Sequence, residues 1–285
     1  MKKEKKFILI FFLIFSNLIA LSIYFDLQEE QVAEVVFFDV GQGDAALIRT
    51  ENRKNILIDG GPKDKIMPLL DEELPFWDRD IDLMILTHAH ADHLSGLVEV
   101  IKSYNVEKIL WNKQDHDSLL FREWERLIAD IPTRKAEKGQ RINLGESHLD
   151  VLYPPANYDS SAGLNENSVV NRLIYENGAI LFTGDAYKEQ ERRLLELERE
   201  CLDAAYGWCR VMNLSADVLK VGHHGSSTSS DKEFIERVSP DVAIVSAGKG
   251  NRYGHPHDEV VELFSELEIL IHKTYKDGNF RVLAD

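Results

Sequence analysis

Three histidines and one aspartate fall within six residues of this chain, in the segment Thr87-His88-Ala89-His90-Ala91-Asp92-His93. The segment follows the apolar run Ile81 to Leu86, which is typical of a buried strand, and it precedes Leu94 to Tyr104, where the apolar spacing predicts a helix. A hydrophobic core cannot satisfy so many neighbouring polar groups. The fold must therefore place this strand end at a site that uses imidazoles and a carboxylate.

The spacing within the cluster indicates a metal centre. His88 and His90 occupy alternate positions of an extended segment, so their side chains project the same way and can bind one ion. Asp92 and His93 stand at the turn into the helix, and we expect them to face a second ion. The cluster predicts a site for two divalent ions.

The rest of the chain alternates short β-branched or aromatic runs with amphipathic stretches. The predicted strands, besides Ile81 to Leu86, are Val35 to Val40, Ala45 to Ile48, Asn55 to Ile58, Lys108 to Trp111, His148 to Leu152, Val169 to Tyr175, Ala179 to Phe182, Val218 to Val221, Val242 to Val245, Ile269 to Lys273 and Phe280 to Val282. Further helices are predicted over Leu119 to Ile131, Lys188 to Leu202, Lys232 to Val238 and Asp258 to Leu267. Meanders with inserted helices favour an α/β (α+β) fold, with two mixed sheets packed face to face and helices outside.

Other polar motifs follow predicted strand ends, where open sheets place their sites. Asp59 precedes two glycines and is open to a second reading as plain turn chemistry. Asp185 ends a strand after a hairpin and is also suited to cap the helix that begins near Lys188. The run His223-His224-Gly225-Ser226 follows another strand.

With these motifs in place, the sequence resembles the metallo-β-lactamase superfamily, whose H-x-H-x-D-H signature is matched at every fixed position. The resemblance implies the αββα sandwich and two divalent ions, Zn or Mn. It implies that Asp185 bridges the ions, that Asp59 orients the site, and that one histidine of the later pair completes the second ion. We choose His224 as that ligand and assign His223 to the substrate or to a supporting role.

One departure narrows the resemblance. Many members carry a third histidine on the first ion, but between residues 94 and 184 only His116 and His148 occur, and neither has the right setting. Instead Asn165 and Ser168 stand before a predicted strand, which leaves open the group that replaces the histidine.

An Asn-x-x-Ser at that place, the opening motif Val36-Phe37-Phe38-Asp39-Val40-Gly41-Gln42-Gly43-Asp44-Ala45, the His-His-Gly-Ser run with Ser226, and Asn251-x-Tyr253-Gly254-His255-Pro256-His257 resemble the C-terminal hydrolase domain of ComEC-type competence proteins. The resemblance covers nearly everything from Val35 to Asp285. It implies a nuclease, with Asp39 and Asp44 near the site. The channel and the oligonucleotide-binding domain of full ComEC have no counterpart, so no transport role is carried over.

His255 and His257 flank Pro256 in a glycine-rich loop. The proline stiffens the turn, so one imidazole can point into the site as a phosphate contact or a general acid. We assign His255 to the leaving group, with Asp92 and Asp185 as the other catalytic residues, and His257 to a supporting role. Surface exposure of both rings is the competing interpretation.

The N-terminus predicts a membrane anchor. Lysines at positions 2, 3, 5 and 6 precede an uncharged run from Phe7 to Phe25, which is closed by Asp26. At about 1.5 Å per residue this run nearly spans a hydrocarbon core, and the lysines predict a cytoplasmic N-terminus. We expect residues 1–30 to form the anchor and residues 31–285 the hydrolase domain outside the cytoplasm. A cleaved signal peptide, which would leave the domain secreted, is the rival, although no A-x-A-like site follows the run.

Charge and cysteines limit the partners. The formal net charge is -16, so the chain lacks the broad positive field that gives strong autonomous binding of nucleic acid. The two cysteines, Cys201 and Cys209, are interpreted as incidental, although a bridge is possible outside the cytoplasm. The charged insertion over residues 189–210 is longer than the family leads us to expect, and we consider a lid or a partner helix.

These observations rank the functions. A bridging aspartate makes the site harder than a thiolate would, and this suits Zn or Mn and phosphate oxygens. We hypothesise phosphodiester hydrolysis, with single-stranded DNA as the first substrate and surface phosphodiesters such as phosphocholine esters as the alternative. Lactone or β-lactam hydrolysis ranks lower, because no lactam-binding loop is matched. A non-enzymatic tethered module ranks lowest, because it predicts eroded ligands.

Overall fold

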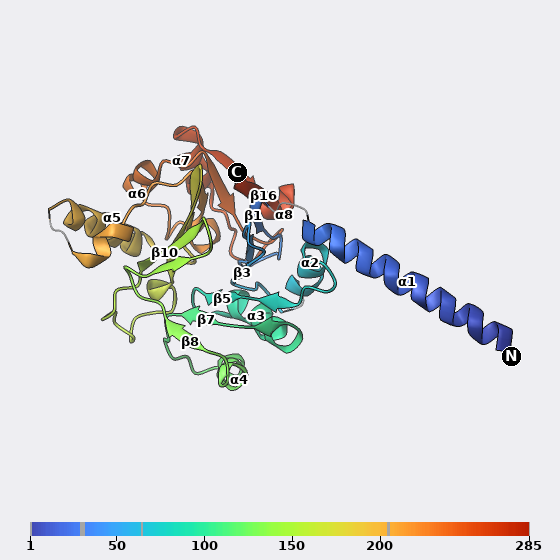
Figure 1. Ribbon diagram of the computed structural model, residues 1–285. Coiled ribbons are helices and arrows are strands. Elements are labelled where there is room, and N and C mark those ends of the chain that lie inside the picture. The colour runs from blue at the N-terminus through green and yellow to red at the C-terminus, as the bar shows by residue number, and fades with distance from the viewer. Residues whose placement is uncertain (1, 29–31, 64, 204–205, 285) are drawn as a thin grey trace. The chain divides into compact units, whose positions relative to one another are not determined.

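The computed structural model describes residues 2–28, 32–63, 65–203 and 206–284. It divides into two compact units, Met1–Gln31 and Val32–Asp285, each of which is described by itself. In the first unit, the described residues form α1 (Lys2–Gln28) (Figure 1). Within α1 the segment Lys5–Tyr24 is long and apolar enough to cross a membrane.

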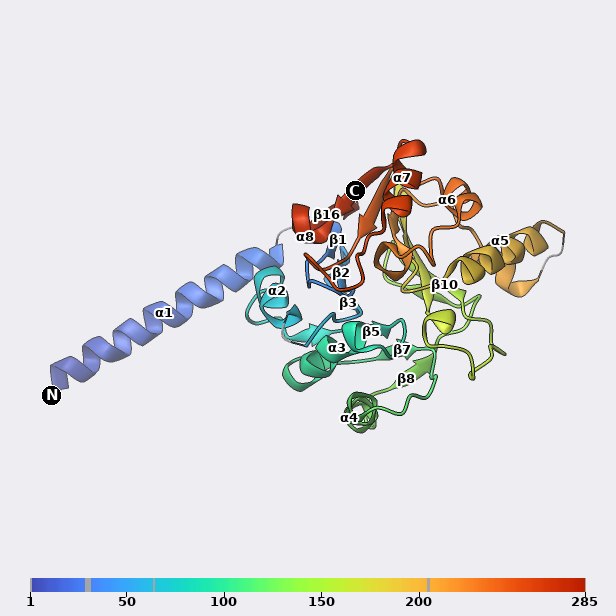
Figure 2. The same cartoon turned by 180° about the vertical axis from the view of Figure 1, so that it is seen from behind.

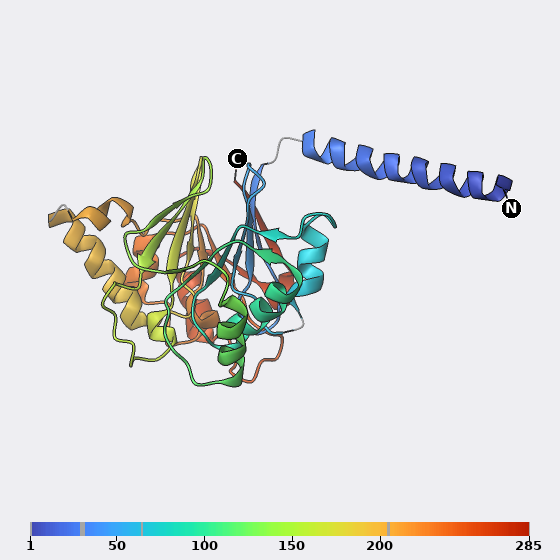
Figure 3. The same cartoon turned by 60° about the horizontal axis from the view of Figure 1, so that its bottom comes forward.

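The second unit holds two seven-stranded sheets with helices on their outer faces, an αββα sandwich (Figure 3). Its strands are β1 (Ala33–Phe37), β2 (Ala46–Arg49), β3 (Asn55–Ile58), β4 (Asp80–Ile81), β5 (Leu83–Leu86), β6 (Asn105–Val106), β7 (Ile109–Trp111), β8 (Thr133–Lys135), β9 (Arg141–Asn143), β10 (His148–Tyr153), β11 (Val170–Tyr175), β12 (Gly178–Phe182), β13 (Val218–Lys220), β14 (Val242–Val245), β15 (Leu270–Lys273) and β16 (Phe280–Ala284). Its helices are α2 (Ile66–Glu73), α3 (Ala91–Ser103), α4 (Leu119–Ile128), α5 (Lys188–Asp203), α6 (Lys232–Val238), α7 (Asp258–Glu266) and α8 (Thr274–Asp277), with the 3-10 helices η1 (Asn165–Asn167), η2 (Gly207–Val211) and η3 (Gly222–Gly225).

The two sheets have mixed topology. The first runs β16-β1-β2-β3-β5-β7-β8, and the second runs β15-β14-β13-β12-β11-β10-β9. In the first, β3, β5, β7 and β8 are parallel neighbours, and in the second β12, β13, β14 and β15 are. The carboxyl ends of parallel neighbours lie at one edge of a sheet. The loops that follow these strands therefore gather at that edge in each sheet.

The core forms three layers, and side chains of β1 pack in two of them. Val36 packs in the layer between the first sheet and helices α2, α3 and α4, which lie along its outer face (Figure 2). Val35 and Phe37 point the other way, into the layer between the sheets, as the two-residue period of a strand requires. There the Phe37 ring stacks on Phe182 of the second sheet, with centroids 5.4 Å apart. A third layer packs the second sheet against α5, α6 and α7.

This architecture confirms the predicted fold class. The predicted helix after the histidine cluster begins three residues earlier than expected, at Ala91, so Asp92 and His93 lie in its first turn. The elements that were not predicted include α2, α8, β6, β8 and β9. The last two are short and largely polar, and they exist because they pair with β7 and β10.

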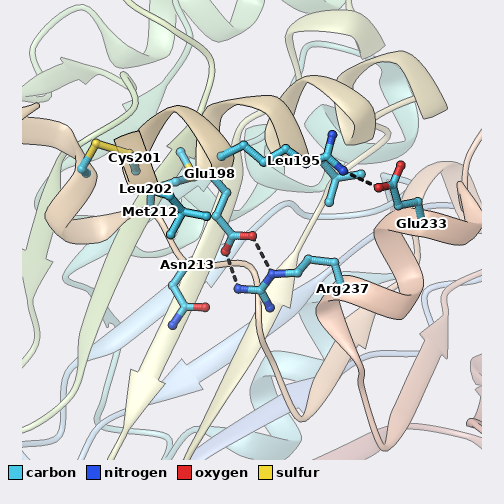
Figure 4. Close-up of a pocket in the computed structure, with 10 residues that line it drawn as sticks. Leu195, Glu198, Cys201, Leu202, Met212, Asn213, Glu233 and Arg237 are labelled. Atoms are coloured by element: carbon cyan, nitrogen blue, oxygen red, sulfur yellow. Dashed lines mark hydrogen bonds and ion pairs between the residues drawn. A yellow bond between two sulfur atoms is a disulfide. The ribbon is translucent and has the colours of Figure 1, made fainter. Parts of the chain in front are cut away.

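The interpretation of Cys201 and Cys209 as incidental is wrong, because they form a disulfide that joins α5 to η2. The helix α5 and its neighbour α6 enclose a cavity of about 530 Å³ (Figure 4). Glu198 and Arg237 form a bidentate ion pair across it. Among the described residues, none from α5 lines the cavity over the histidine cluster, so the structure gives no support for a lid.

Candidate metal centre

The polar residues singled out in the sequence meet at the carboxyl ends of strands from both sheets. The first sheet supplies Asp59 after β3 and the segment from Thr87 to His93 after β5. The second sheet supplies Asp185 after β12 and His224 after β13. Two groups of side chains here are close enough to hold an ion, namely His88, His90 and Asp185, and Asp44, His93, Asp185 and His224.

The first group is held by a short hydrogen-bond relay. Thr87 donates its hydroxyl to Asp59 Oδ2 at 2.7 Å, so the hydroxyl oxygen of Thr87 can accept from His88 Nδ1 at 3.1 Å. This leaves Nε2 of His88 unprotonated, 3.0 Å from His90 Nδ1 and 3.7 Å from Asp185 Oδ2. The two imidazoles and the carboxylate therefore converge on one point, which we name the His88 side.

The second group is oriented in the same way. His93 Nδ1 donates to Asp59 Oδ2 at 2.8 Å, and His224 Nδ1 donates to the Ser246 carbonyl at 2.9 Å. Their Nε2 atoms lie 3.4 and 3.6 Å from oxygens of Asp185. A histidine held at one nitrogen by a carboxylate or a carbonyl presents the other to a metal.

Distance alone admits either Asp44 or Asp92 as the second carboxylate, and the contacts separate them. Asp44 lies behind the rings, 3.2 Å from His224 Nδ1 and 3.8 Å from His93 Nδ1. Asp92 lies in front, with Oδ2 3.3 Å from His224 Nε2. The geometry favours Asp92, His93 and His224 with Asp185 as the ligand set, which we name the His224 side, and gives Asp44 a supporting role.

Asp185 is shared by both sides. Within the described residues, His93 Nε2, His224 Nε2 and Asp185 Oδ1 are buried and have no hydrogen-bond partner. Buried polar atoms are normally paired, so three unpaired atoms around one carboxylate indicate a missing partner. A nitrogen and carboxylate donor set of this kind fits Zn or Mn. The residues present therefore fit two divalent ions.

The pKa shifts of the site residues differ between the His88 side and the His224 side. Burial, together with the neighbouring His93, lowers the pKa of His88 well below its usual value, and burial also lowers the pKa of His90. At His93 and His224 the net shift goes the other way. Burial alone would lower the pKa of both, but the carboxylate of Asp185 raises it, and the pKa of His224 reaches about 9. At Asp185 itself burial is outweighed by these imidazoles, which hold its pKa well below the usual range.

Strained backbone marks the same place. Asp59, His223 and His224 have φ of 56°, 46° and 55°, in the left-handed region that non-glycine residues rarely adopt. Such conformations cost on the order of 1–3 kcal/mol each and cluster at functional sites. The strain at His224 carries its ring under the strand ends, buried against Ser246.

Sequence reasoning missed Lys220. Its ammonium group is buried, forms an ion pair with Asp44 and donates to the Gly184 carbonyl at 3.1 Å. Burial opposes the shift, but Lys220 together with His224 and His93 holds the pKa of Asp44 below its usual value. A signal was present, since a lysine inside the apolar strand Val218–Lys220 needs a buried partner.

A cavity of about 390 Å³ opens over the centre and is lined by Gln42, His90, Ala91, Asp92, Asn165, Asp185, Tyr187, His223, His224, Tyr253 and His255. Within the described residues, Asn165 Oδ1 and His255 Nδ1 are buried in its wall without a hydrogen-bond partner. Burial and the adjacent His224 lower the pKa of His255 to about 4, so its ring is neutral at pH 7. His223 has Nε2 3.9 Å from Asp185 Oδ2, farther than His224.

Where the third histidine is missing, Ser168 contacts the centre instead. Its hydroxyl lies 3.3 Å from His88 Nδ1 and accepts from the Asp185 amide at 3.2 Å. His148 stands in β10 beside Asp150, and His116 lies near Phe121 in the turn before α4. Both are absent from the two candidate ligand groups of the described chain.

Three predicted site residues support loops rather than line the cavity. Asp39 accepts from the Gly41 amide, and its own amide donates to Asn279. Ser226 accepts from Thr228 in the turn after His224. Both ring nitrogens of His257 are engaged, one with the Ser227 amide and the other with the Tyr253 carbonyl.

Comparison with known proteins agrees with this geometry. The family model of the metallo-β-lactamase superfamily matches residues 38–249. A solved structure described as a metal-dependent hydrolase of the β-lactamase superfamily superposes with a TM-score of 0.57 at 13% identity, covering 89% of this chain and all of that one.

Two relatives match most of the chain. ComE operon protein 3 of Bacillus subtilis (strain 168) is 30% identical over 272 residues, which cover 87% of this chain and 32% of that protein. Competence protein ComA of Neisseria gonorrhoeae is 32% identical over 237 residues, which cover 81% and 29%. The chain thus spans about a third of their length, and the predicted resemblance to competence proteins is confirmed. The chain belongs to the metallo-β-lactamase superfamily, and its homologues include competence proteins.

Proposed function

We propose that this chain is a dinuclear phosphodiesterase that cleaves DNA, with single-stranded DNA as its preferred form. The observation that carries the proposal is the carboxylate Asp185, shared by two groups of imidazoles and left with an unpaired buried oxygen. Such a hard donor set suits ions that bind phosphate oxygens. The similarity to competence proteins favours DNA among phosphodiesters.

Two divalent ions bound here would lower the pKa of water and offset charge on the phosphate oxygens. His88, His90, Asp92, His93, Asp185 and His224 would hold them. Asp59 and Thr87 keep the rings of His88 and His93 turned toward Asp185. Because these contacts fix the orientation of the two rings, the ligands need little rearrangement on binding.

The cavity residues have their own roles in this proposal. His255 is neutral at pH 7 and has a free Nδ1, so it positions the leaving-group oxygen by a hydrogen bond rather than by donating the proton of an imidazolium. Asn165 Nδ2 donates to the Tyr187 hydroxyl at 3.1 Å, which leaves Asn165 Oδ1 without a partner among the described residues. In this proposal Asn165 Oδ1 and the Tyr187 hydroxyl orient the substrate. Asp39, Ser226 and His257 act through the loops that they hold.

We further propose that the hydrolase unit works outside the cytoplasm on a membrane tether. The helical segment Lys5–Tyr24 has the length and composition of a membrane span, and the lysines before it favour a cytoplasmic N-terminus. The disulfide between Cys201 and Cys209 suits an oxidising compartment. Protease digestion of intact spheroplasts tests this: degradation of the hydrolase unit from outside supports it, and full protection contradicts it.

The test of the activity uses the full chain in detergent micelles, loaded with Mn²⁺ or Zn²⁺. Labelled single-stranded DNA, duplex DNA, p-nitrophenylphosphocholine and nitrocefin are compared under one condition. We expect cleavage of single-stranded DNA to have the largest kcat/KM. A larger kcat/KM for the phosphocholine ester would replace DNA by surface phosphodiesters, and dominant nitrocefin turnover would overturn the phosphodiesterase assignment.

A further inference from the structure

A second hollow adjoins the cavity over the metal centre. It has a volume of about 530 Å³ and is lined by Gln42, Pro62, Ala91, Asp92, Ser95, Asn251, Arg252 and Tyr253, which we name the Tyr253 groove. Four of these residues also line the metal-centre cavity, namely Gln42, Ala91, Asp92 and Tyr253. A chain-like substrate with one phosphate at the centre can therefore continue into the groove.

One wall of the groove is a loop held by its own hydrogen bonds. Asn251 Oδ1 accepts from the amides of Tyr253 and His255 at 3.1 and 3.0 Å, and its Nδ2 donates to the carbonyls of Gly248 and His255. Gln42 on the facing loop accepts from the Gly248 amide at 3.2 Å. The groove is thus organised before any substrate enters, which lowers the entropic cost of binding.

Two side chains give the groove its chemistry. The Tyr253 ring is 48% exposed and lies nearly parallel to His255, with centroids 5.5 Å apart. The exposed Arg252 guanidinium lies 4.8 Å from the Tyr253 ring centre and donates to its hydroxyl at 2.5 Å. An aromatic face beside a guanidinium matches a base beside its phosphate.

On the basis of the proposed phosphodiesterase function, we propose that the Tyr253 groove binds the nucleotide next to the cleaved bond of a single-stranded nucleic acid. Tyr253 stacks on the base, and Arg252 pairs with the phosphate that follows. A duplex cannot use this site without unstacking a base, so the groove selects single strands. The guanidinium disfavours a choline group, which binds in cages of several aromatic rings.

This subsite also explains how an acidic chain can bind a negatively charged nucleic acid. The chain carries a formal net charge of -16, which opposes the approach of a polyanion. A stacked base adds affinity that does not depend on charge. The acidic balance and a nucleic-acid substrate are then compatible.

The test measures KM of the Mn²⁺-loaded full chain for a labelled single-stranded octanucleotide and for methyl p-nitrophenyl phosphate. Tyr253→Leu raises KM for the oligonucleotide by roughly 5- to 150-fold, the range for loss of one base–aromatic stack. The same variant raises KM for the small ester by a smaller factor, because that ester has no neighbouring base to stack on Tyr253. The matched control is Tyr206→Leu, which removes a 54% exposed tyrosine stacked on Trp208 beside the disulfide.

A set of octanucleotides, each with one abasic position, identifies the contact. At one position next to the cut, removal of the base weakens binding to the wild-type chain. In Tyr253→Leu the same removal causes no further rise in KM. Arg252→Gln reduces the slope of log KM against log salt by roughly 0.7, the value for one phosphate of a single strand. The control Arg122→Gln, on the exposed face of α4, leaves that slope unchanged.

The outcomes separate the two proposals. Cleavage of DNA with equal losses for Tyr253→Leu and Tyr206→Leu, or additive abasic effects at every position, overturns the subsite and leaves the phosphodiesterase intact. Cleavage of p-nitrophenylphosphocholine with a Tyr253-dependent KM, but no cleavage of DNA, assigns the groove to a choline head group and overturns the inference. Failure to cleave any phosphodiester overturns both.

Discussion

The two sides of the metal centre share Asp185 but differ in charge. On the His88 side, the two imidazoles face one carboxylate, and burial keeps both rings neutral at pH 7. On the His224 side, carboxylates at Asp44, Asp59, Asp92 and Asp185 surround two imidazoles, and both rings hold protons in the metal-free chain. An ion on the His88 side therefore meets ligands that are ready, whereas an ion on the His224 side must displace protons.

The difference shows why the fold needs both sheets. The His88 side is built mainly from one short segment after β5, which keeps its geometry whenever that segment is folded. The His224 side joins α3 of the first sheet to the strand ends of the second. Its acidic groups are balanced by Lys220 and by the two imidazolium rings until metal arrives. We expect the His224 side to be the more sensitive to pH and to the packing of the sheets.

The largest effect should follow from a change that the two sides share. Asp185→Asn removes the carboxylate that faces His88, His93 and His224. We expect loss of both ions and a fall in kcat beyond the roughly 10- to 100-fold that loss of a supporting group costs. Metal analysis and kcat measure it, circular dichroism checks the fold, and Asp117→Asn at an exposed site is the control. Two retained ions would contradict the shared carboxylate.

The next test separates the sides. His88→Ala should lose the ion of its own side and keep the other, and His224→Ala should do the reverse. We therefore expect about one ion per chain in each variant, and proton release on loading only in His88→Ala, which keeps His93 and His224. Mass spectrometry of the native protein counts the ions, and calorimetry in buffers of different ionisation enthalpy counts the protons. Equal proton release in the two variants would contradict the difference in protonation between the His88 side and the His224 side.

A smaller effect is expected from Lys220, whose charge offsets the acidic excess of the His224 side. Lys220→Met leaves Asp44 buried without its cation, and we expect the metal-free chain to lose about 3 kcal/mol of unfolding free energy. The double variant Lys220→Met, Asp44→Asn should recover at least half of it. Urea unfolding measures both, with exposed Lys249→Met as control. A double variant no more stable than Lys220→Met would show that the ion pair is not the cause.

The mildest test leaves the chain unchanged. At pH 7 the wild-type chain should release about two protons on binding two ions, since His93 and His224 are protonated and His88 and His90 are neutral. Near pH 10, above the pKa of about 9 for His224, the release should fall by about one proton. Calorimetric titration at both pH values provides the comparison. Release that is the same at pH 7 and pH 10 would contradict the raised pKa of His224.

How far the sequence alone predicts this site depends on how local each signal is. The histidine cluster could be interpreted from spacing, because alternation along a strand end is a local property. Asp44 and Asp92 could not be ranked from sequence, because their roles depend on which nitrogen of His224 each one faces. Asp39 was assigned to the site through its motif, yet it holds a loop against Asn279, a contact 240 residues away in the chain.

The fold shows the same limit. The predicted strands with apolar runs appear, since burial alone selects them. The helix α2 was missed because it contains Pro68. A proline is tolerated in the first turn of a helix, but in a sequence it indicates a helix end. The strand β8 consists of Thr133, Arg134 and Lys135, and its pairing with β7 comes from tertiary structure rather than from its own residues.

The most direct test of a two-ion phosphodiesterase is a titration of the metal-free full chain with Mn²⁺ from zero to three equivalents, with cleavage of labelled single-stranded DNA measured at each step. We predict that cleavage stays low up to one equivalent, rises between one and two, and then levels off, and that Asp185→Asn stays inactive throughout. Full cleavage at one equivalent or fewer, or no cleavage with two ions bound, would contradict the account.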